Sequence, residues 1–130
     1  MPSILARSLV ALGRLKRTLG EVTSASELLL EGLDLFRALG HKPGIAMALE
    51  ELGAVSAVQA NGAQAVMLFS VAHALREGMG APLLPVDRAP YDSIVATSRA
   101  RFGESAFAVA WAHAAARPYQ EVVEEILKNG

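Results

Sequence analysis

Apolar residues recur along this 130-residue chain at the three- and four-residue spacing of helical faces, and glycines separate the patterned stretches. In the first stretch the leucines step by four, three, three and four positions and share one helical face: Leu5, Leu9, Leu12, Leu15 and Leu19. Glycine adopts the left-handed backbone that ends a helix without a Cβ penalty. The pattern therefore predicts a helix end near each of Gly20, Gly40, Gly62, Gly80 and Gly103.

The pattern predicts an all-α protein of about seven helices, because no stretch alternates for long enough to indicate a strand. The expected spans are about 4–19, 25–39, 44–60, 63–79, 87–102, 104–115 and 119–128. Ser24 followed by Glu27 is typical of a capping box for the second helix, and Asp87 is a candidate cap for the fifth. The inner face of the fifth helix should comprise Tyr91, Ile94, Val95, Ser98 and Phe102.

The chain matches itself at an offset of 40 residues. Leu9, Leu12, Gly13, Ala25, Leu28, Leu35 and Gly40 fall on Leu49, Leu52, Gly53, Ala65, Leu68, Leu75 and Gly80. Leu29 falls on Phe69 and Gly32 falls on Ala72, so a large residue matches a large one and a small residue matches a small one. Two antiparallel helices approach closely only where one side chain is small. We therefore expect Gly13 and Gly53 to be the close-contact points of two helix pairs, with Leu29 and Phe69 filling the gap.

These residues resemble a known family. Leu12-Gly13 with Ala25, and Leu52-Gly53 with Ala65, resemble tetratricopeptide repeats. Residues 36–40, 72–82 and 102–107 resemble, more narrowly, the C-terminal repeat region of bacterial transcriptional regulators of the LuxR and SARP types and of related ATPase-containing signalling proteins. The resemblance implies antiparallel helix pairs stacked as a short right-handed superhelix. It also implies a role as the sensor or regulatory arm of such a regulator.

Each repeat in a stack buries its apolar faces against its neighbours, so a stack of only two repeats leaves an apolar face open at each end. We expect residues 1–80 to form two helix pairs, and residues 81–130 to form a helical cap that packs with them as one domain. The cap covers one end. At the other end we expect either a homodimer through the first helix pair or docking onto preceding repeats of a longer chain.

Composition narrows the classes of function. Hydrophobic residues make up 52% of the chain, which excludes disorder, and the net charge of −1 does not favour nucleic acid as a direct partner. There is no cysteine, so disulfides and thiolate metal sites are excluded. No apolar run is long enough to span a membrane. We expect a cytoplasmic protein that binds no membrane. The sequence contains no phosphate-binding glycine loop, so we expect no cofactor.

Few residues are candidates for chemistry. The three histidines lie 32 and 40 residues apart, at His41, His73 and His113, so we expect no metal site and no catalytic role. Glu50, Glu51, Glu121, Glu124 and Glu125 are interpreted as solvated helix faces. We therefore expect that the chain is not an enzyme.

Two candidate binding surfaces remain. Arg7, Arg14 and Arg17 can share a face of the first helix and form a possible partner surface, although a solvated face is the ordinary alternative. Met79, Tyr91, Phe107 and Trp111 form a possible effector pocket between the repeats and the cap, although core packing is the alternative for Phe107 and Trp111. The leading hypothesis is a protein–protein interaction or scaffold module, and the second is a small-molecule sensor.

Overall fold

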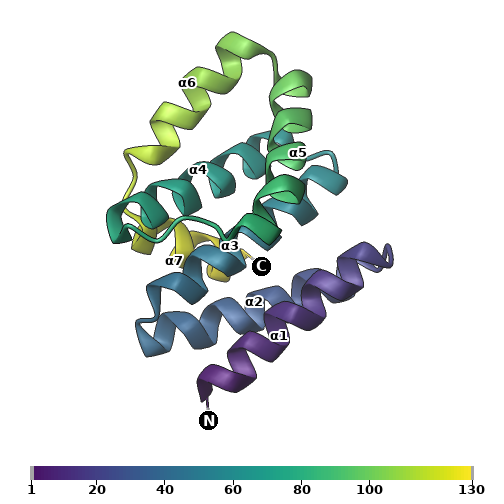
Figure 1. Cartoon of the computed structure of the whole chain (residues 1–130), viewed down its shortest axis with the longest axis vertical. Coiled ribbons are helices and arrows are strands. Elements are labelled where there is room, and N and C mark those ends of the chain that lie inside the picture. The colour runs from purple at the N-terminus through teal and green to yellow at the C-terminus, as the bar shows by residue number, and fades with distance from the viewer. Residues whose placement is uncertain (1, 130) are drawn as a thin grey trace.

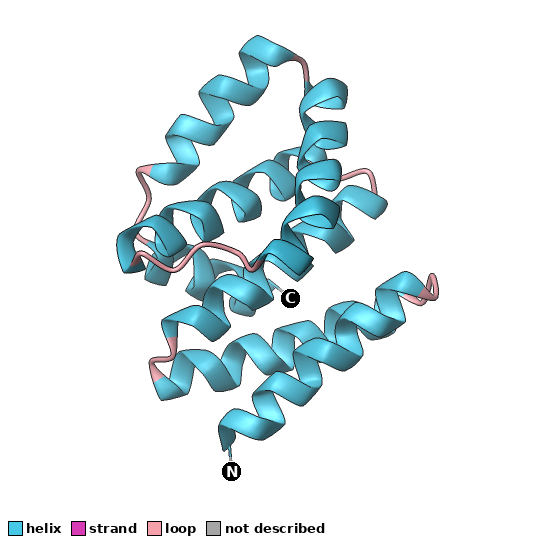
Figure 2. Ribbon diagram, in the orientation of Figure 1, coloured by secondary structure: helices cyan, strands magenta, loops and turns pink. Residues whose placement is uncertain are grey.

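The computed structural model describes residues 2–129, and all of its regular structure is helical over that range (Figure 2). The helices are α1 (Pro2–Thr18), α2 (Val22–Leu39), α3 (Lys42–Val58), α4 (Gly62–Met79), α5 (Pro85–Phe102), α6 (Glu104–Ala115) and α7 (Tyr119–Asn129). The predicted all-α class and the seven helices are confirmed. None of the described helices is long and apolar enough to cross a membrane.

The first four helices form two stacked antiparallel pairs, α1 with α2 and α3 with α4, and α2 packs on α3 between them (Figure 1). Glycine sets the close approach within each pair. A Cβ on Gly13 would lie 2.7 Å from Leu29 Cδ2, and one on Gly53 would lie 2.6 Å from Phe69 Cε1. Both distances are too short for a real contact. The contact points predicted from the repeat are confirmed.

Two of the predicted helix caps are wrong. Helix α2 begins at Val22, so Ser24 lies inside the helix and makes no capping box, and Glu21 holds the N-cap position without a side-chain hydrogen bond. Helix α5 begins at Pro85 with Leu84 as its N-cap, so Asp87 lies in the first turn. Proline presets the first-turn φ angle and needs no donor there, which starts α5 two residues earlier than expected.

Other side chains cap the second pair. His41 Nδ1 accepts a hydrogen bond of 3.0 Å from the Gly44 amide at the start of α3. Asn61 Oδ1 accepts one of 3.3 Å from the Gln64 amide at the start of α4. The turn between these helices uses Ala60, which has a φ of 60°, so Gly62 begins α4 rather than ending α3.

The last three helices pack mainly on α4. Helix α6 lies along it, and Ser70 Oγ donates a 2.6 Å hydrogen bond to the Trp111 carbonyl. Helix α7 contacts both α2 and α4 and buries Val122, Val123 and Ile126 in the main core. Helix α5 contacts α3 and α4 through its predicted inner face, whose five residues are half-buried or buried. The cap thus lies along the side of the second pair as well as over its end.

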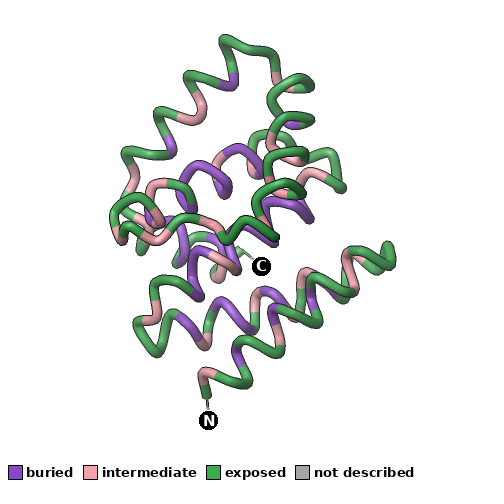
Figure 3. The backbone as a smooth tube through the Cα atoms, viewed as in Figure 1, coloured by how far each residue is buried: buried purple, intermediate pink, exposed green. Residues whose placement is uncertain are grey.

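The leucines predicted to share one face of α1 do not form its buried face. Burial falls instead on Ala6, Val10 and Gly13, while four of the five leucines are exposed and Leu9 is half-buried (Figure 3). Small residues face α2 because the two backbones approach closely there: a Cβ on Gly32 would lie 2.8 Å from Val10 Cγ2. The leucine-rich face of α1 therefore points away from its partner helix.

Candidate functional site

A groove lies between α1 and the start of α5, with α3 as its floor. Two adjoining cavities of about 390 and 420 Å³ make it up, and both are lined by Arg14, Leu83 and Asp87. Its α1 wall carries Arg7, Arg14 and Arg17, the three residues of the predicted partner surface. The structure thus brings these arginines to one concavity, whereas the sequence alone could place them only on one face of a helix.

Two of these arginines are engaged within the molecule. Arg14 Nε donates to Glu51 Oε2 at 2.8 Å, and Arg17 donates to Glu51 Oε1 at 3.3 Å. Arg14 also lies 3.5 Å from Asp87 Oδ1 on α5. Glu51 therefore ties α1 to α3 across the groove floor. Arg7 is exposed and makes no ion pair with any residue between 2 and 129, so it is the cation of the groove that remains available.

The expectation that Glu50 and Glu51 face solvent is wrong, since only 6% and 8% of their surfaces are exposed. Helix α3 contacts α1, α2, α4 and α5, which leaves it no solvated face. Each carboxylate is matched by arginine. Glu50 accepts hydrogen bonds from Arg76 Nε at 2.5 Å and from Arg76 Nη2 at 2.8 Å, so the ion pair is bidentate. Burial raises the pKa of Glu50, and Arg76 opposes that rise.

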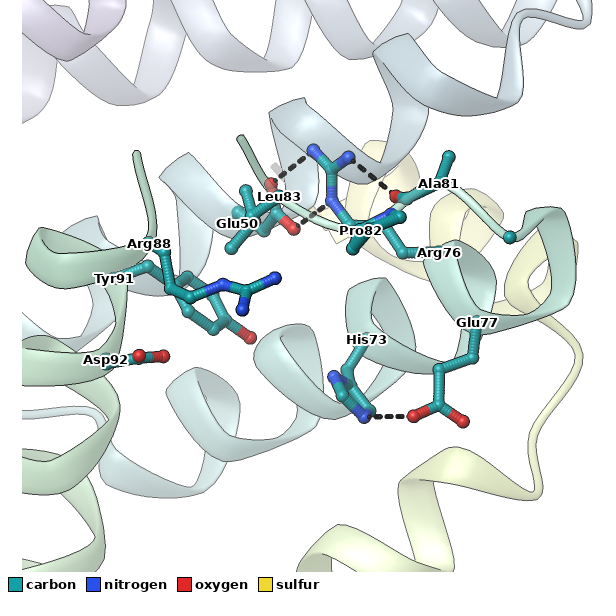
Figure 4. A pocket seen from close by; sticks show the side chains of 11 residues that line it. Glu50, His73, Arg76, Glu77, Ala81, Pro82, Leu83, Arg88, Tyr91 and Asp92 are labelled. Atoms are coloured by element: carbon teal, nitrogen blue, oxygen red, sulfur yellow. Dashed lines mark hydrogen bonds and ion pairs between the residues drawn. The ribbon is translucent and has the colours of Figure 1, made fainter. Parts of the chain in front are cut away.

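A further cavity of about 520 Å³ lies between α4, α5 and the loop that joins them. Figure 4 shows the guanidinium of Arg88 reaching into it, near the Tyr91 hydroxyl. Arg88 makes no ion pair with the described part of the chain, while His73 Nε2 lies 2.9 Å from Glu77 Oε1. Burial raises the pKa of the Tyr91 hydroxyl well above its ordinary value. This cavity therefore combines one unpaired cation with a neutral phenol, and the carboxylates of Glu77 and Asp92 also line it.

The four residues of the predicted effector pocket do not line one cavity. Tyr91 alone lines the α4–α5 cavity. The rings of Phe107 and Trp111 stack with their centroids 5.3 Å apart, and the centroids of the Trp111 and His73 rings are 5.7 Å apart. Met79 packs against the main core. The aromatic pair of α6 is thus chiefly a packing contact with α4, as the alternative interpretation held.

The sequence indicated the arginines of α1, but not that Glu50 and Glu51 are buried in the groove floor and paired with arginine. One signal was present, however. Glu50 and Glu51 are flanked by Leu49 and Leu52 in a helix whose other residues after the first turn are uncharged, so α3 has no polar face. Carboxylates in such a helix are more consistent with paired, buried groups than with a solvated face. Their arginine partners, Arg76 for Glu50 and Arg14 with Arg17 for Glu51, could not be found without the fold.

The histidines have separate environments. His41 caps α3, His73 lines the α4–α5 cavity, and His113 lines a shallow apolar hollow beside α6. Within residues 2–129 no three histidine or carboxylate side chains are grouped so that they could hold a metal ion. In comparisons with protein-family models, curated proteins and solved structures, no match was found.

Proposed function

We propose that this chain is a protein-interaction module whose groove between α1 and α5 holds a segment of a partner protein. The observation that carries the proposal is the make-up of the groove walls. Leu84 and Val86 are exposed at the start of α5, opposite the arginines of α1. Exposed apolar side chains beside a fixed polar floor are typical of peptide-binding grooves in helical repeats.

The chemistry of the groove favours a particular kind of segment. Because Glu51 already engages Arg14 and Arg17, the partner gains most from contacts with the apolar wall and with Arg7. A segment with two or three apolar side chains and one carboxylate meets both needs. Apolar burial then supplies most of the affinity, and the carboxylate contact with Arg7 sets the orientation of the segment.

The resemblance to the repeat region of LuxR- and SARP-type regulators supports a more specific role. In that role the module is the sensor or regulatory arm of a cytoplasmic bacterial transcriptional regulator, and the bound segment belongs to another domain of the same regulator or to a signalling partner. The groove between α1 and α5 is the contact that transmits the signal.

A phage-displayed library of random 15-residue peptides, selected on the immobilised chain, tests the groove. We expect enriched peptides that combine apolar residues with a carboxylate. Fluorescence polarisation should show that Val86→Asp weakens their binding by about tenfold or more, since a charge on the apolar wall must be desolvated when the peptide binds.

Val109→Asp is the matched control, because Val109 is as exposed as Val86 (71% and 78%) but lies on α6, away from the groove. It should leave peptide affinity within a factor of two. The proposal fails if no peptide is enriched, or if the enriched peptides bind both variants equally well.

A second function has one specific observation in its favour. The unpaired Arg88 in the α4–α5 cavity suits a small anionic effector (Figure 4). A thermal-shift panel of mono- and dicarboxylates and phosphate esters tests this function. We expect at least one compound to raise Tm by a few degrees in the natural chain and not in Arg88→Ala. Equal shifts in the two proteins, or none in the natural chain, would exclude an effector at this cavity.

A further inference from the structure

The outer face of α1 carries a stripe of large apolar side chains that no other described element covers. Ile4, Leu12 and Leu15 have 60%, 42% and 52% of their surfaces exposed. Steps of three or four residues return to the same side of a helix, so these residues and Ser8 form one stripe. It lies opposite the small residues that face α2. Contiguous exposed apolar surface of this kind marks a protein contact.

The internal repeat shows what covers the same face elsewhere in the molecule. Forty residues further on, the stripe falls on Gly44, Ala48, Leu52 and Val55 of α3, all of which are buried. Helix α2 packs on α3, and its Leu30 lines one crevice with Leu52 and Val55. The second helix of the preceding pair therefore covers this face of α3, whereas no helix within residues 2–129 covers the corresponding face of α1.

We propose that the outer face of α1 binds an antiparallel helix pair of the same kind as α1–α2, with its second helix lying along Ile4, Leu12 and Leu15. This surface is separate from the groove and does not depend on the function proposed there. It requires a partner whose apolar helical face matches the one that α2 presents to α3.

A second copy of this chain is a poorer occupant of the surface. Its own α2 is already packed against its α3. A copy of α1 lying against α1 would supply no opposite charge to Arg7, which has no ion pair within residues 2–129, because the helix carries four cations and no carboxylate. Like charges placed across an interface oppose association.

One contact also sets the shape of the partner. Gly44 lies so close to Phe36 that a Cβ on it would be 2.3 Å from the ring Cδ1. At the equivalent position α1 has Ile4, which needs far more room. The docking helix must therefore carry a small residue where α2 carries Phe36. An unaltered duplicate of α1–α2 would clash with Ile4, and a duplicate with Phe36→Ala would not.

The test places such a pair ahead of the full chain. Residues 2–40 with Phe36→Ala, followed by one histidine copied from position 41, are joined to residue 2, which reproduces the link between α2 and α3. We expect one cooperative unfolding transition, with Tm raised by roughly 5 °C or more. The same extension with Phe36 retained should raise Tm less. Two separate transitions, or an unchanged Tm, would overturn the proposal.

Leu12→Glu in the receiving α1 tests the docking face itself. In the natural chain this exposed substitution should change Tm by no more than about 1 °C, as is usual for surface positions. In the extended chain it should lower Tm by several degrees. An equal effect in both proteins contradicts the proposal. So does a dimer of the natural chain, seen by light scattering, that Leu12→Glu dissociates, because a second copy would then be the occupant.

Discussion

Replacing Arg76 by alanine should destabilise the protein by about 3 kcal/mol at neutral pH, because breaking a buried ion pair leaves its other charge unpaired. The remaining charge would be Glu50, whose surface is 6% exposed and whose two carboxylate oxygens both accept from Arg76. Thermal and urea unfolding of the variant and the natural chain would measure the loss.

The cost of this substitution should also depend on pH. The ordinary pKa of Glu50 is 4.5, burial raises it in the folded protein, and Arg76 opposes the rise. Without Arg76 the folded-state pKa lies further above the unfolded value. The folded variant then keeps a proton that the unfolded chain has released, so its stability falls as pH increases from about 4.5 towards that higher pKa. The destabilisation should be larger at pH 7 than at pH 4.5.

Two further proteins test this explanation. Glu50→Gln combined with Arg76→Ala should recover part of the lost stability and lose the added pH dependence, because no unpaired charge is left buried at this site. Arg37→Ala, which breaks exposed pairs with Asp34 and Glu124, should barely change Tm. A destabilisation of Arg76→Ala that is constant between pH 4.5 and pH 7 would rule out the charge of Glu50 as its cause.

Alanine at Gly53 should destabilise the fold by about 1–3 kcal/mol, the usual cost of overpacking a core. The new Cβ would lie 2.6 and 2.8 Å from Phe69 Cε1 and Cδ1, and that ring is 1% exposed and held in an edge contact with Tyr91. The higher helix propensity of alanine, worth about 1 kcal/mol, offsets only part of this.

Gly78 is the matched control for Gly53. It also lies within a helix, but a Cβ there would meet no atom within 4 Å. Gly78→Ala should therefore stabilise the protein by up to about 1 kcal/mol, through helix propensity alone. Chemical unfolding of both variants measures the contrast. If both substitutions shifted stability in the same direction, close helix approach would not be the reason for Gly53.

The sequence predicted the helix pairs well, because the signals that indicate them are local. Leucine spacing, the glycine after each helix and the repeat at offset 40 all depend on residues within one or two helices. Gly13 and Gly53 could be recognised for the same reason, since a glycine at equivalent places in two helices has little other explanation. The caps were harder to predict, because a side-chain cap is worth only about 1 kcal/mol. Helices α2 and α5 begin after Glu21 and Leu84 without a side-chain cap, although Ser24 and Asp87 lie within three residues.

The sites could not be predicted in the same way. Met79, Tyr91, Phe107 and Trp111 looked like one pocket because they are the large side chains of one region. In the structure they lie in different places: Tyr91 lines the α4–α5 cavity, Phe107 and Trp111 stack on each other, and Met79 packs against the main core. Glu50 and Arg76 come from different helices, and only their packing shows that each carboxylate has an arginine.

By itself the sequence determined that this protein is a stack of helix pairs, and where the backbones of each pair meet. Periodicity and residue size act within a helix or across one pair, so they can be read along the chain. For α1 and α3, only the tertiary structure decided which residues are inside. Helix α1 turns its small residues towards α2 and its leucines outwards, whereas α3 is enclosed on every side with two carboxylates in its core. That choice depends on how many neighbours each helix has, which local sequence does not encode.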